Sequence, residues 1–189
     1  MIYSIYGFGK VKTEASVGLT IRSVGNNDEV IYAQFLKDNS SGECDVLRRL
    51  GVEVISTRTS RLVYNEDDIQ DCKNLLKFLL DQYPDVIIAD EILVAYDLGF
   101  LSFANIKALV DNCNARGIDL CMTGRISSKD KRYNITSISD IVTNAYAVKH
   151  CFNTYCKSCK CEYEYHYRYC PKCGRELEES KPSKKGRDY

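Results

Sequence analysis

Short apolar runs recur along the first three quarters of the chain, and turn-forming residues stand between them. Each run has four to seven residues, a length that suits a strand better than a helix. Because the runs are apolar almost throughout, they are typical of strands buried on both faces of a sheet. The strands predicted in this way are residues 2–6, 29–35, 52–56, 85–90, 118–123 and 140–143.

Apolar residues at helical spacing lie between these runs. One such segment follows Asn65, which can cap a helix, opens with acidic residues and ends before Pro84. A second starts at Ser102 and stops at residues 116–117, and residues 15–24 form a third. Strands that alternate with helices predict an α/β fold with a mostly parallel sheet of the P-loop (RecA-like) type and helices on both of its faces.

A loop rich in glycine and lysine separates the first predicted strand from the helix that follows it. Glycines let such a loop gather backbone N–H groups around a phosphate, while a lysine reaches the outer phosphates and a hydroxyl binds Mg²⁺. Lys12 and Thr13 are placed for the last two roles. The predicted nucleotide-binding residues are Gly7, Phe8, Gly9, Lys10, Val11, Lys12 and Thr13.

This loop departs from the pattern G-x-x-x-x-G-K-[ST], which has glycine where Tyr6 and Val11 stand. A β-branched residue costs roughly 1–2 kcal/mol wherever φ must be positive. We therefore expect either that the loop bends differently at Val11 or that part of its phosphate cradle is lost. The competing interpretation is a turn that is rich in glycine and lysine and has no nucleotide function.

Two carboxylates, Asp90 and Glu91, come at the end of the apolar run 85–90. Parallel sheets bind ligands outside the carboxyl ends of their strands, where the glycine-rich loop would also lie. We therefore predict that Thr13, Asp90 and Glu91 hold Mg²⁺, although solvated loop acids are the alternative. Arg125, at the end of the next predicted strand, adds a cation to the same edge.

Cysteines crowd together after residue 150. Cys156, Cys159, Cys170 and Cys173 form two C-x-x-C knuckles with the spacing of a tetrahedral zinc ribbon. Tyrosines alternate with polar residues over 161–169, which predicts a hairpin strand with a tyrosine face. That face could stack on nucleic-acid bases, but we favour packing on protein, because so small a unit must bury an apolar face somewhere.

Composition limits the domains and the surroundings of the protein. We expect a P-loop domain over residues 1–150, a zinc ribbon over 151–177 and a charged, flexible tail over 178–189. Lys plus Arg and Asp plus Glu number 26 each, so no global charge indicates a polyanion or membrane partner. No apolar run suits a signal peptide or a membrane span, and the ten cysteines fit a reducing compartment, so we expect a cytoplasmic protein.

The order of these motifs over residues 2–150 resembles that of the P-loop type of ATP:cob(I)alamin adenosyltransferase, also called the corrinoid adenosyltransferase family. That family has a glycine-rich phosphate loop, then QFLK, an F-x-W pair, LDE, LTGR and a terminal AD-x-VT…KH. The matching places here are residues 6–22, Gln34–Lys37, Leu62-x-Tyr64, Ala89–Glu91, Met122–Arg125, and 139–143 with Lys149–His150. The zinc ribbon lies outside this resemblance.

The resemblance implies a reaction in which cob(I)alamin attacks C5′ of ATP and triphosphate leaves. It implies that Lys12 and Glu91 act in catalysis and that Thr13 and Asp90 serve phosphate and metal. Supporting cations would be Arg22 and Arg125. Leu62 and Tyr64 would press on the corrin, Tyr64 as a third catalytic residue. The implied ligands are Mg-ATP and a corrinoid, beside the zinc of the ribbon, and the implied assembly is a homodimer.

Two other functions compete with a working transferase. One is a degenerate P-loop protein that acts as an interaction or nucleic-acid-binding module through its ribbon, since Val11, Glu14, Leu62 and Tyr64 all depart from the family pattern at functional places. Glu14 also puts a negative charge in the first turn of a helix that would face phosphate. The other, less favoured, is a type II thymidine kinase, which also joins a P-loop domain to a Cys₄ zinc site.

Overall fold

The computed structural model describes residues 1–38, 40–57, 66–146, 154–163, 169–170 and 172–179. The chain divides into two compact units, Met1–Tyr146 and Ala147–Tyr189. Each unit has a sheet of its own. They are described separately below.

A six-stranded parallel sheet forms the centre of the first unit. Its order is β3-β2-β4-β5-β1-β6, and every printed pairing within it is parallel. Each apolar run predicted above coincides with one of these strands to within a residue or two at either end, so the predicted α/β sheet is confirmed. The strands are β1 (Ile2–Tyr6), β2 (Val30–Gln34), β3 (Glu53–Ser56), β4 (Val86–Asp90), β5 (Asp119–Gly124) and β6 (Ile141–Asn144).

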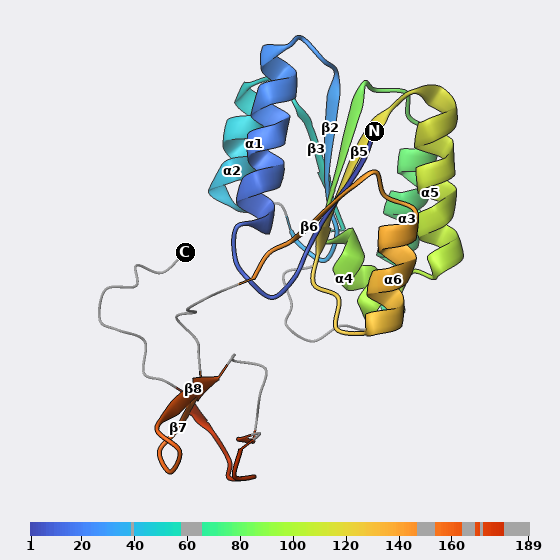
Figure 1. Cartoon of the computed structure of the whole chain (residues 1–189). Helices are drawn as coiled ribbons and strands as arrows, with labels where there is room; N and C mark the ends of the chain where they lie inside the picture. The colour runs from blue at the N-terminus through green and yellow to red at the C-terminus, as the bar shows by residue number, and fades with distance from the viewer. Residues whose placement is uncertain (39, 58–65, 147–153, 164–168, 171, 180–189) are drawn as a thin grey trace. The chain divides into compact units, whose positions relative to one another are not determined.

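Helices cover both faces of this sheet (Figure 1). One face carries α1 (Lys12–Gly25) and α2 (Gly42–Arg49). The other carries α3 (Glu66–Leu80), α4 (Ile92–Asp97), α5 (Phe103–Arg116) and α6 (Lys129–Ser137). The helices α2, α4 and α6 were not predicted. All three are short: α4 has only six residues, although four of them are buried, and in α6 only Ile135 is buried.

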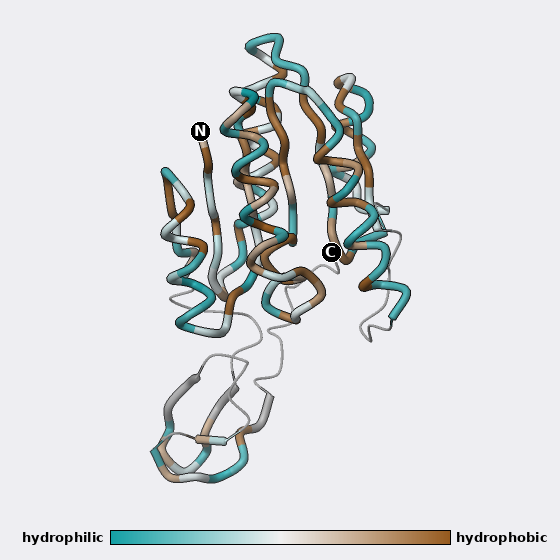
Figure 2. The backbone as a smooth tube through the Cα atoms, turned by 90° about the vertical axis from the view of Figure 1, so that its right-hand side faces the viewer, coloured by the Kyte–Doolittle hydropathy of each residue, from teal (hydrophilic) through white to brown (hydrophobic). Residues whose placement is uncertain are grey.

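The core consists of two apolar clusters, one on each face of the sheet. Alternate residues along a strand enter opposite clusters: Ile31 and Ala33 face α3 and α5, whereas Val30 and Tyr32 face α1 and α2. Because both faces are covered, both sets are apolar, which explains the unbroken runs in the sequence. Figure 2 shows the strands largely in brown, while the helices change between brown and teal.

Capping agrees with the sequence at α5. The Ser102 hydroxyl accepts a hydrogen bond from the Asn105 N–H, and the Asn105 side chain accepts one from the Ser102 N–H, which completes a capping box. The helix ends at Gly117, which has a φ of 72°. The other predicted cap, Asn65, lies outside the described residues.

The second unit has a small antiparallel sheet of order β8-β7-β9. Its strands are β7 (Thr154–Cys156), β8 (Cys161–Tyr163) and β9 (Glu178–Glu179). The predicted hairpin strand over 161–169 therefore begins as β8, and its residues 164–168 lie outside the described residues. Among the helices that the structure describes in either unit, none combines the length and apolar character that crossing a membrane requires.

Candidate functional site

The loop of residues 7–13 joins the carboxyl end of β1 to the start of α1, as predicted. It is held against the end of β6, because the Gly9 N–H donates to the Ala145 carbonyl oxygen at 2.9 Å. Gly7 has a φ of 125°, and a Cβ there would lie 2.3 Å from the same oxygen. The close approach of two backbones therefore explains why glycine stands at position 7.

Val11 keeps the backbone conformation that a glycine would adopt. Its φ is 80° and its ψ is 0°, in the left-handed region, and its carbonyl oxygen accepts the N–H of Ala15 at 2.9 Å. The side chain is 60% exposed, so burial does not offset the strain. The loop therefore does not bend differently at Val11, as one of the two expectations held; it keeps the left-handed conformation with the strain that this imposes on valine. A strained residue retained in a loop of this kind is typical of functional sites.

Lys12 folds back over the loop. Its ammonium group donates to the Gly9 carbonyl oxygen at 2.6 Å. Burial lowers the pKa of Lys12, and the negative charges of Glu91 and Asp90 oppose this effect only in part. The ammonium group therefore lies over the loop, within electrostatic reach of Asp90 and Glu91.

Asp90 is the centre of a hydrogen-bonded group at the end of β4. Its side chain is fully buried, and it accepts hydrogen bonds from the Thr123 hydroxyl at 2.6 Å and from the Lys37 ammonium at 2.6 Å. The Thr13 hydroxyl lies 3.3 and 3.4 Å from its two oxygens. Burial lowers the pKa of Lys37, but Asp90 and Glu91 outweigh this and raise it above the ordinary value.

Glu91 directly follows this group and begins the turn into α4. It has a φ of 62°, and its N–H donates to the Thr123 hydroxyl at 3.0 Å. Burial and the neighbouring Asp90 raise the pKa of its carboxyl, although Lys37, Lys12 and Arg125 act in the opposite direction. Two carboxylates and three cations are thus held within electrostatic reach of one another.

Arg125 adds its positive charge beside the loop, with its guanidinium 5.8 Å from the centre of the Phe8 ring. We call the loop 7–13, together with Lys37, Asp90, Glu91, Thr123 and Arg125, the polar edge. All of it lies at or just after the carboxyl ends of parallel strands, where ligands bind in such sheets. Its backbone N–H groups and cations suit a polyphosphate, and its hydroxyl and carboxylate oxygens suit Mg²⁺.

The sequence of this chain is similar to those of known proteins. The family model of the ATP:corrinoid adenosyltransferases BtuR/CobO/CobP matches residues 1–161. The corrinoid adenosyltransferase of Escherichia coli (strain K12) is 31% identical over 159 residues, which cover 78% of this chain and 76% of that protein. The chain belongs to the corrinoid adenosyltransferase family. The corrinoid adenosyltransferase CobA of Salmonella typhimurium (strain LT2) is also 31% identical, over the same shares of both chains.

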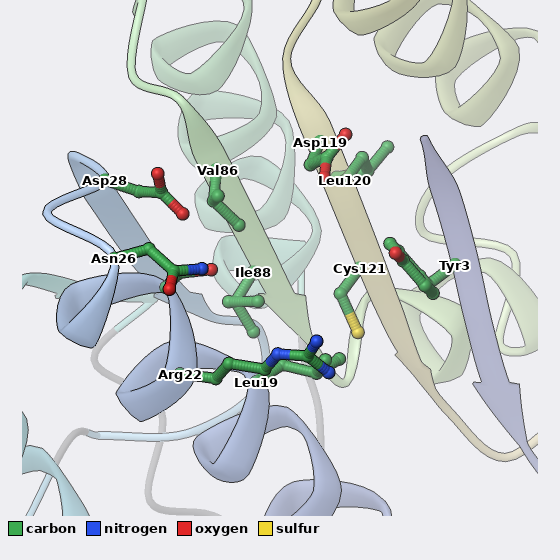
Figure 3. A pocket seen from close by; sticks show the side chains of 11 residues that line it. Tyr3, Leu19, Arg22, Asn26, Asp28, Val86, Ile88, Asp119, Leu120 and Cys121 are labelled. Atoms are coloured by element: carbon green, nitrogen blue, oxygen red, sulfur yellow. The ribbon is translucent and has the colours of Figure 1, made fainter.

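Three residues that the family resemblance suggested are not part of the polar edge as described. Arg22 lies on α1 about 13 Å along the helix axis from Thr13. It lines a cavity of about 220 Å³ among α1, β4 and β5 (Figure 3). Asp119, which begins β5, lines the same cavity, so this cavity lies toward the amino ends of the strands. The other two, Leu62 and Tyr64, lie outside the described residues.

No role was predicted from the sequence for two members of the polar edge. Lys37 is the last residue of the QFLK segment, and Thr123 precedes the Gly124–Arg125 pair at the end of β5. Thr123 ends the predicted strand 118–123, and Lys37 comes two residues after the predicted strand 29–35. These positions at the carboxyl edge of the sheet are the signal that could have identified them. Gly124 fixes this corner, because a Cβ on it would lie 2.7 Å from the Val94 nitrogen.

The second unit gathers the four predicted cysteines, Cys156, Cys159, Cys170 and Cys173, which we call the cysteine cluster. Their sulfur atoms all lie within 4.8 Å of one another. The pairs Cys156–Cys173 and Cys159–Cys170 are 3.6 and 3.9 Å apart. Four sulfurs at these separations are compatible with one tetrahedral metal ion.

The two knuckles of the cysteine cluster share one backbone feature. The residue after the second cysteine of each knuckle is left-handed: Lys160 has a φ of 51° and Gly174 a φ of 70°. In the first knuckle, the Cys159 N–H also points at the Cys156 sulfur, 3.4 Å away. A left-handed turn is thus repeated directly after both knuckles.

Proposed function

We propose that this protein transfers the adenosyl group of ATP to the cobalt of a reduced corrinoid. In this reaction the cobalt electron pair forms a bond to C5′, the bond from C5′ to the triphosphate oxygen breaks, and its electrons leave with triphosphate. The observation that supports the proposal is the polar edge itself, in a chain of the corrinoid adenosyltransferase family. Its loop keeps the left-handed turn at Val11 and places Lys12 and Thr13 beside Asp90.

The residues of the polar edge fit a magnesium ion. Thr13 and Asp90 offer hard oxygen atoms that already lie 3.3 Å apart, with the Glu91 carboxylate next in the chain. We propose that these three residues hold Mg²⁺. When bound, the ion would neutralise negative charge on the phosphates.

The chain's own groups then have separate tasks. Lys12, Arg125 and the loop N–H groups other than that of Gly9, which donates to Ala145, hold the triphosphate and stabilise the charge that develops on its leaving oxygen. Glu91 helps to position this cluster through its electrostatic attraction to Lys12, Lys37 and Arg125. Contact of Leu62 and Tyr64 with the corrin stays a prediction, as does the homodimer.

The direct test is ATP-dependent conversion of chemically reduced cob(I)alamin to a light-sensitive adenosylated product. Lys12→Ala should reduce the rate by at least about 100-fold, because it removes a charged contact to the leaving group. Lys73→Ala, an exposed lysine of α3, is the matched control and should react like the native chain. Absence of product at saturating ATP would favour the degenerate nucleotide-binding module instead. The family match gives no support to a thymidine kinase.

We also propose that the cysteine cluster binds one zinc ion. The close sulfur atoms and the repeated knuckle turn support this metal, since thiolates bind Zn²⁺ at about 2.3 Å in a tetrahedron. Metal analysis of the purified chain should find one zinc, which Cys170→Ser should lose. Cys72→Ala, in the core of the first unit, should retain it. Disulfides among the four cysteines would contradict the site.

A cytoplasmic location fits the remaining thiols. Cys44, Cys72, Cys113 and Cys121 are buried and free. Burial raises the pKa of all four thiols, most clearly for Cys72 and Cys121, where it reaches about 12. Unpaired thiols of this kind are typical of proteins in a reducing compartment.

A further inference from the structure

We propose that Lys37 occupies the metal position of the nucleotide-free enzyme and leaves it when Mg-ATP binds. This inference rests on the proposed function, because it concerns the site where magnesium would be held. It assigns to Lys37 the role of a positioning residue: its ammonium keeps the metal-binding oxygen atoms together and excludes a free divalent ion.

The contacts of the Lys37 ammonium carry the proposal. Its nitrogen lies 2.6 Å from an Asp90 carboxylate oxygen and 3.2 Å from the Thr13 hydroxyl. These are two of the three groups that would bind Mg²⁺. The Asp90 carboxylate is fully buried, and the ammonium of Lys37 forms its ion pair. A monovalent cation thus sits between the oxygen atoms that the divalent ion would need.

The backbone around Lys37 is built to deliver the side chain to this place. Leu36 has a φ of 57°, which is strained for a residue with a branched side chain. Its N–H donates to the Thr57 hydroxyl at 2.9 Å, and the Phe35 N–H donates to the Asp90 carbonyl oxygen at 2.9 Å. Two hydrogen bonds therefore hold a strained turn directly before Lys37. Strain kept by its surroundings is expected where a side chain must be aimed.

The ammonium and a magnesium ion cannot occupy this place together. Magnesium binds oxygen ligands at about 2.1 Å, so an ion on Thr13 and Asp90 would lie only a few ångströms from the Lys37 nitrogen. At such a distance, inside a partly desolvated site, the two positive charges repel strongly. The Lys37 side chain is 30% exposed, so it can swing outward. Phosphate oxygens that arrive with the metal would offer the displaced ammonium a new partner.

The experiment measures metal binding without nucleotide, with Mn²⁺ as the probe in place of Mg²⁺. Free Mn²⁺ is counted by its electron paramagnetic resonance signal during titration of the native chain, Lys37→Met and Lys73→Met. We expect Lys37→Met to bind Mn²⁺ at least about tenfold more tightly than the native chain, because the competing cation is gone. The exposed Lys73→Met control should match the native chain. Equal Mn²⁺ affinity in all three proteins would overturn the proposal.

A second measurement uses the native chain, in case Lys37→Met does not fold. Nuclear magnetic resonance of labelled lysine side chains should show the Lys37 ammonium signal shift when Mg-ATP is added, and stay unchanged with Mg²⁺ alone. If the chemical shift of Lys37 does not change although the protein binds Mg-ATP, the proposal is also overturned. Failure of the native chain to bind Mg-ATP would instead contradict the proposed function, and the Mn²⁺ titration would still decide the role of Lys37.

Discussion

The polar edge and the cysteine cluster hold their functional atoms in place by different means. The polar edge stands on a parallel sheet that buries an apolar cluster on each face, so its loops are attached to a core that exists without any ligand. In the second unit, the described core consists of Cys156, Cys170 and Leu177, with Cys159 packed against it. There the candidate ligands are themselves the core.

The two units should therefore differ in how far their folding depends on a bound ligand. A unit with so few described apolar side chains gains little from burial, and a metal can supply the missing free energy. The first unit can instead tolerate strain, as Val11, Leu36 and Glu91 show by their positive φ angles. Loss of a ligand should therefore unfold the second unit, whereas changes in the polar edge should alter binding while the sheet stays intact.

The largest expected effect is that of removing the metal from the cysteine cluster. Cys170→Ser, or a strong chelator, should abolish the structure of the second unit, because structural zinc contributes about 10–16 kcal/mol in small domains of this kind. Hydrogen exchange should lose protection in β7 and at residues 169–170, and stay unchanged in the strands of the first unit. Retained protection in the metal-free second unit would show that it folds by burial alone, and the two units would then not differ in their need for a ligand.

The next effect concerns the close backbone approach at Gly7. Gly7→Ala should destabilise the first unit by about 1–3 kcal/mol, because its Cβ would meet the Ala145 oxygen in a strained conformation. Gly18→Ala is the matched control: nothing lies within 4 Å of its Cβ, and it should stabilise α1 by about 0.5–1 kcal/mol. Urea unfolding measures both. If the free energy of unfolding changes in the same direction in both variants, the backbone contact between the loop and Ala145 is not rigid.

The sheet could be predicted from the sequence because strands buried on both faces leave continuous apolar runs. The polar edge could be predicted in part, since Thr13, Asp90 and Glu91 directly follow or precede recognisable elements. Lys37 was given no role although it lies at the same edge, because its contact with Asp90 depends on a left-handed Leu36, and leucine does not mark such a turn as glycine would. Arg22 was suggested by resemblance alone, although its spacing from Thr13 along a helix already separates the two.

A smaller effect is expected from restoring glycine at position 11. Val11→Gly removes the strain of a β-branched residue at a φ of 80°, but adds freedom to the unfolded chain, so the net gain in stability should be at most about 1 kcal/mol. ATP should bind more tightly, as isothermal calorimetry can show. Val46→Gly, an exposed valine in α2, is the control and should lose about 0.5 kcal/mol. Loss of stability in both variants would mean that Val11 is not strained.

The smallest effect is a pH dependence that Glu91 brings to the stability of the first unit. Burial and the neighbouring Asp90 raise its pKa above the ordinary value of 4.5 in the folded chain, so the folded state holds this proton more tightly than the unfolded state. The resulting stabilisation is fully present below the unfolded pKa and is lost as pH rises through the folded pKa. Above its folded pKa, the ionised Glu91 therefore opposes folding.

Glu91→Gln should consequently raise the thermal midpoint relative to the native chain at the upper end of a range from about pH 4 to pH 8, because the buried glutamate resists ionisation whereas glutamine has no charge to gain. The difference should shrink as pH falls and disappear near pH 4, where both side chains are neutral. Melting curves over this range, followed by circular dichroism without metal or nucleotide, measure it. A difference that stays constant with pH would assign the effect to packing. The same variant should bind Mn²⁺-ATP more weakly than the native chain. The buried Glu91 carboxylate is unfavourable without a cation, and a bound cation neutralises it, whereas glutamine offers no such charge.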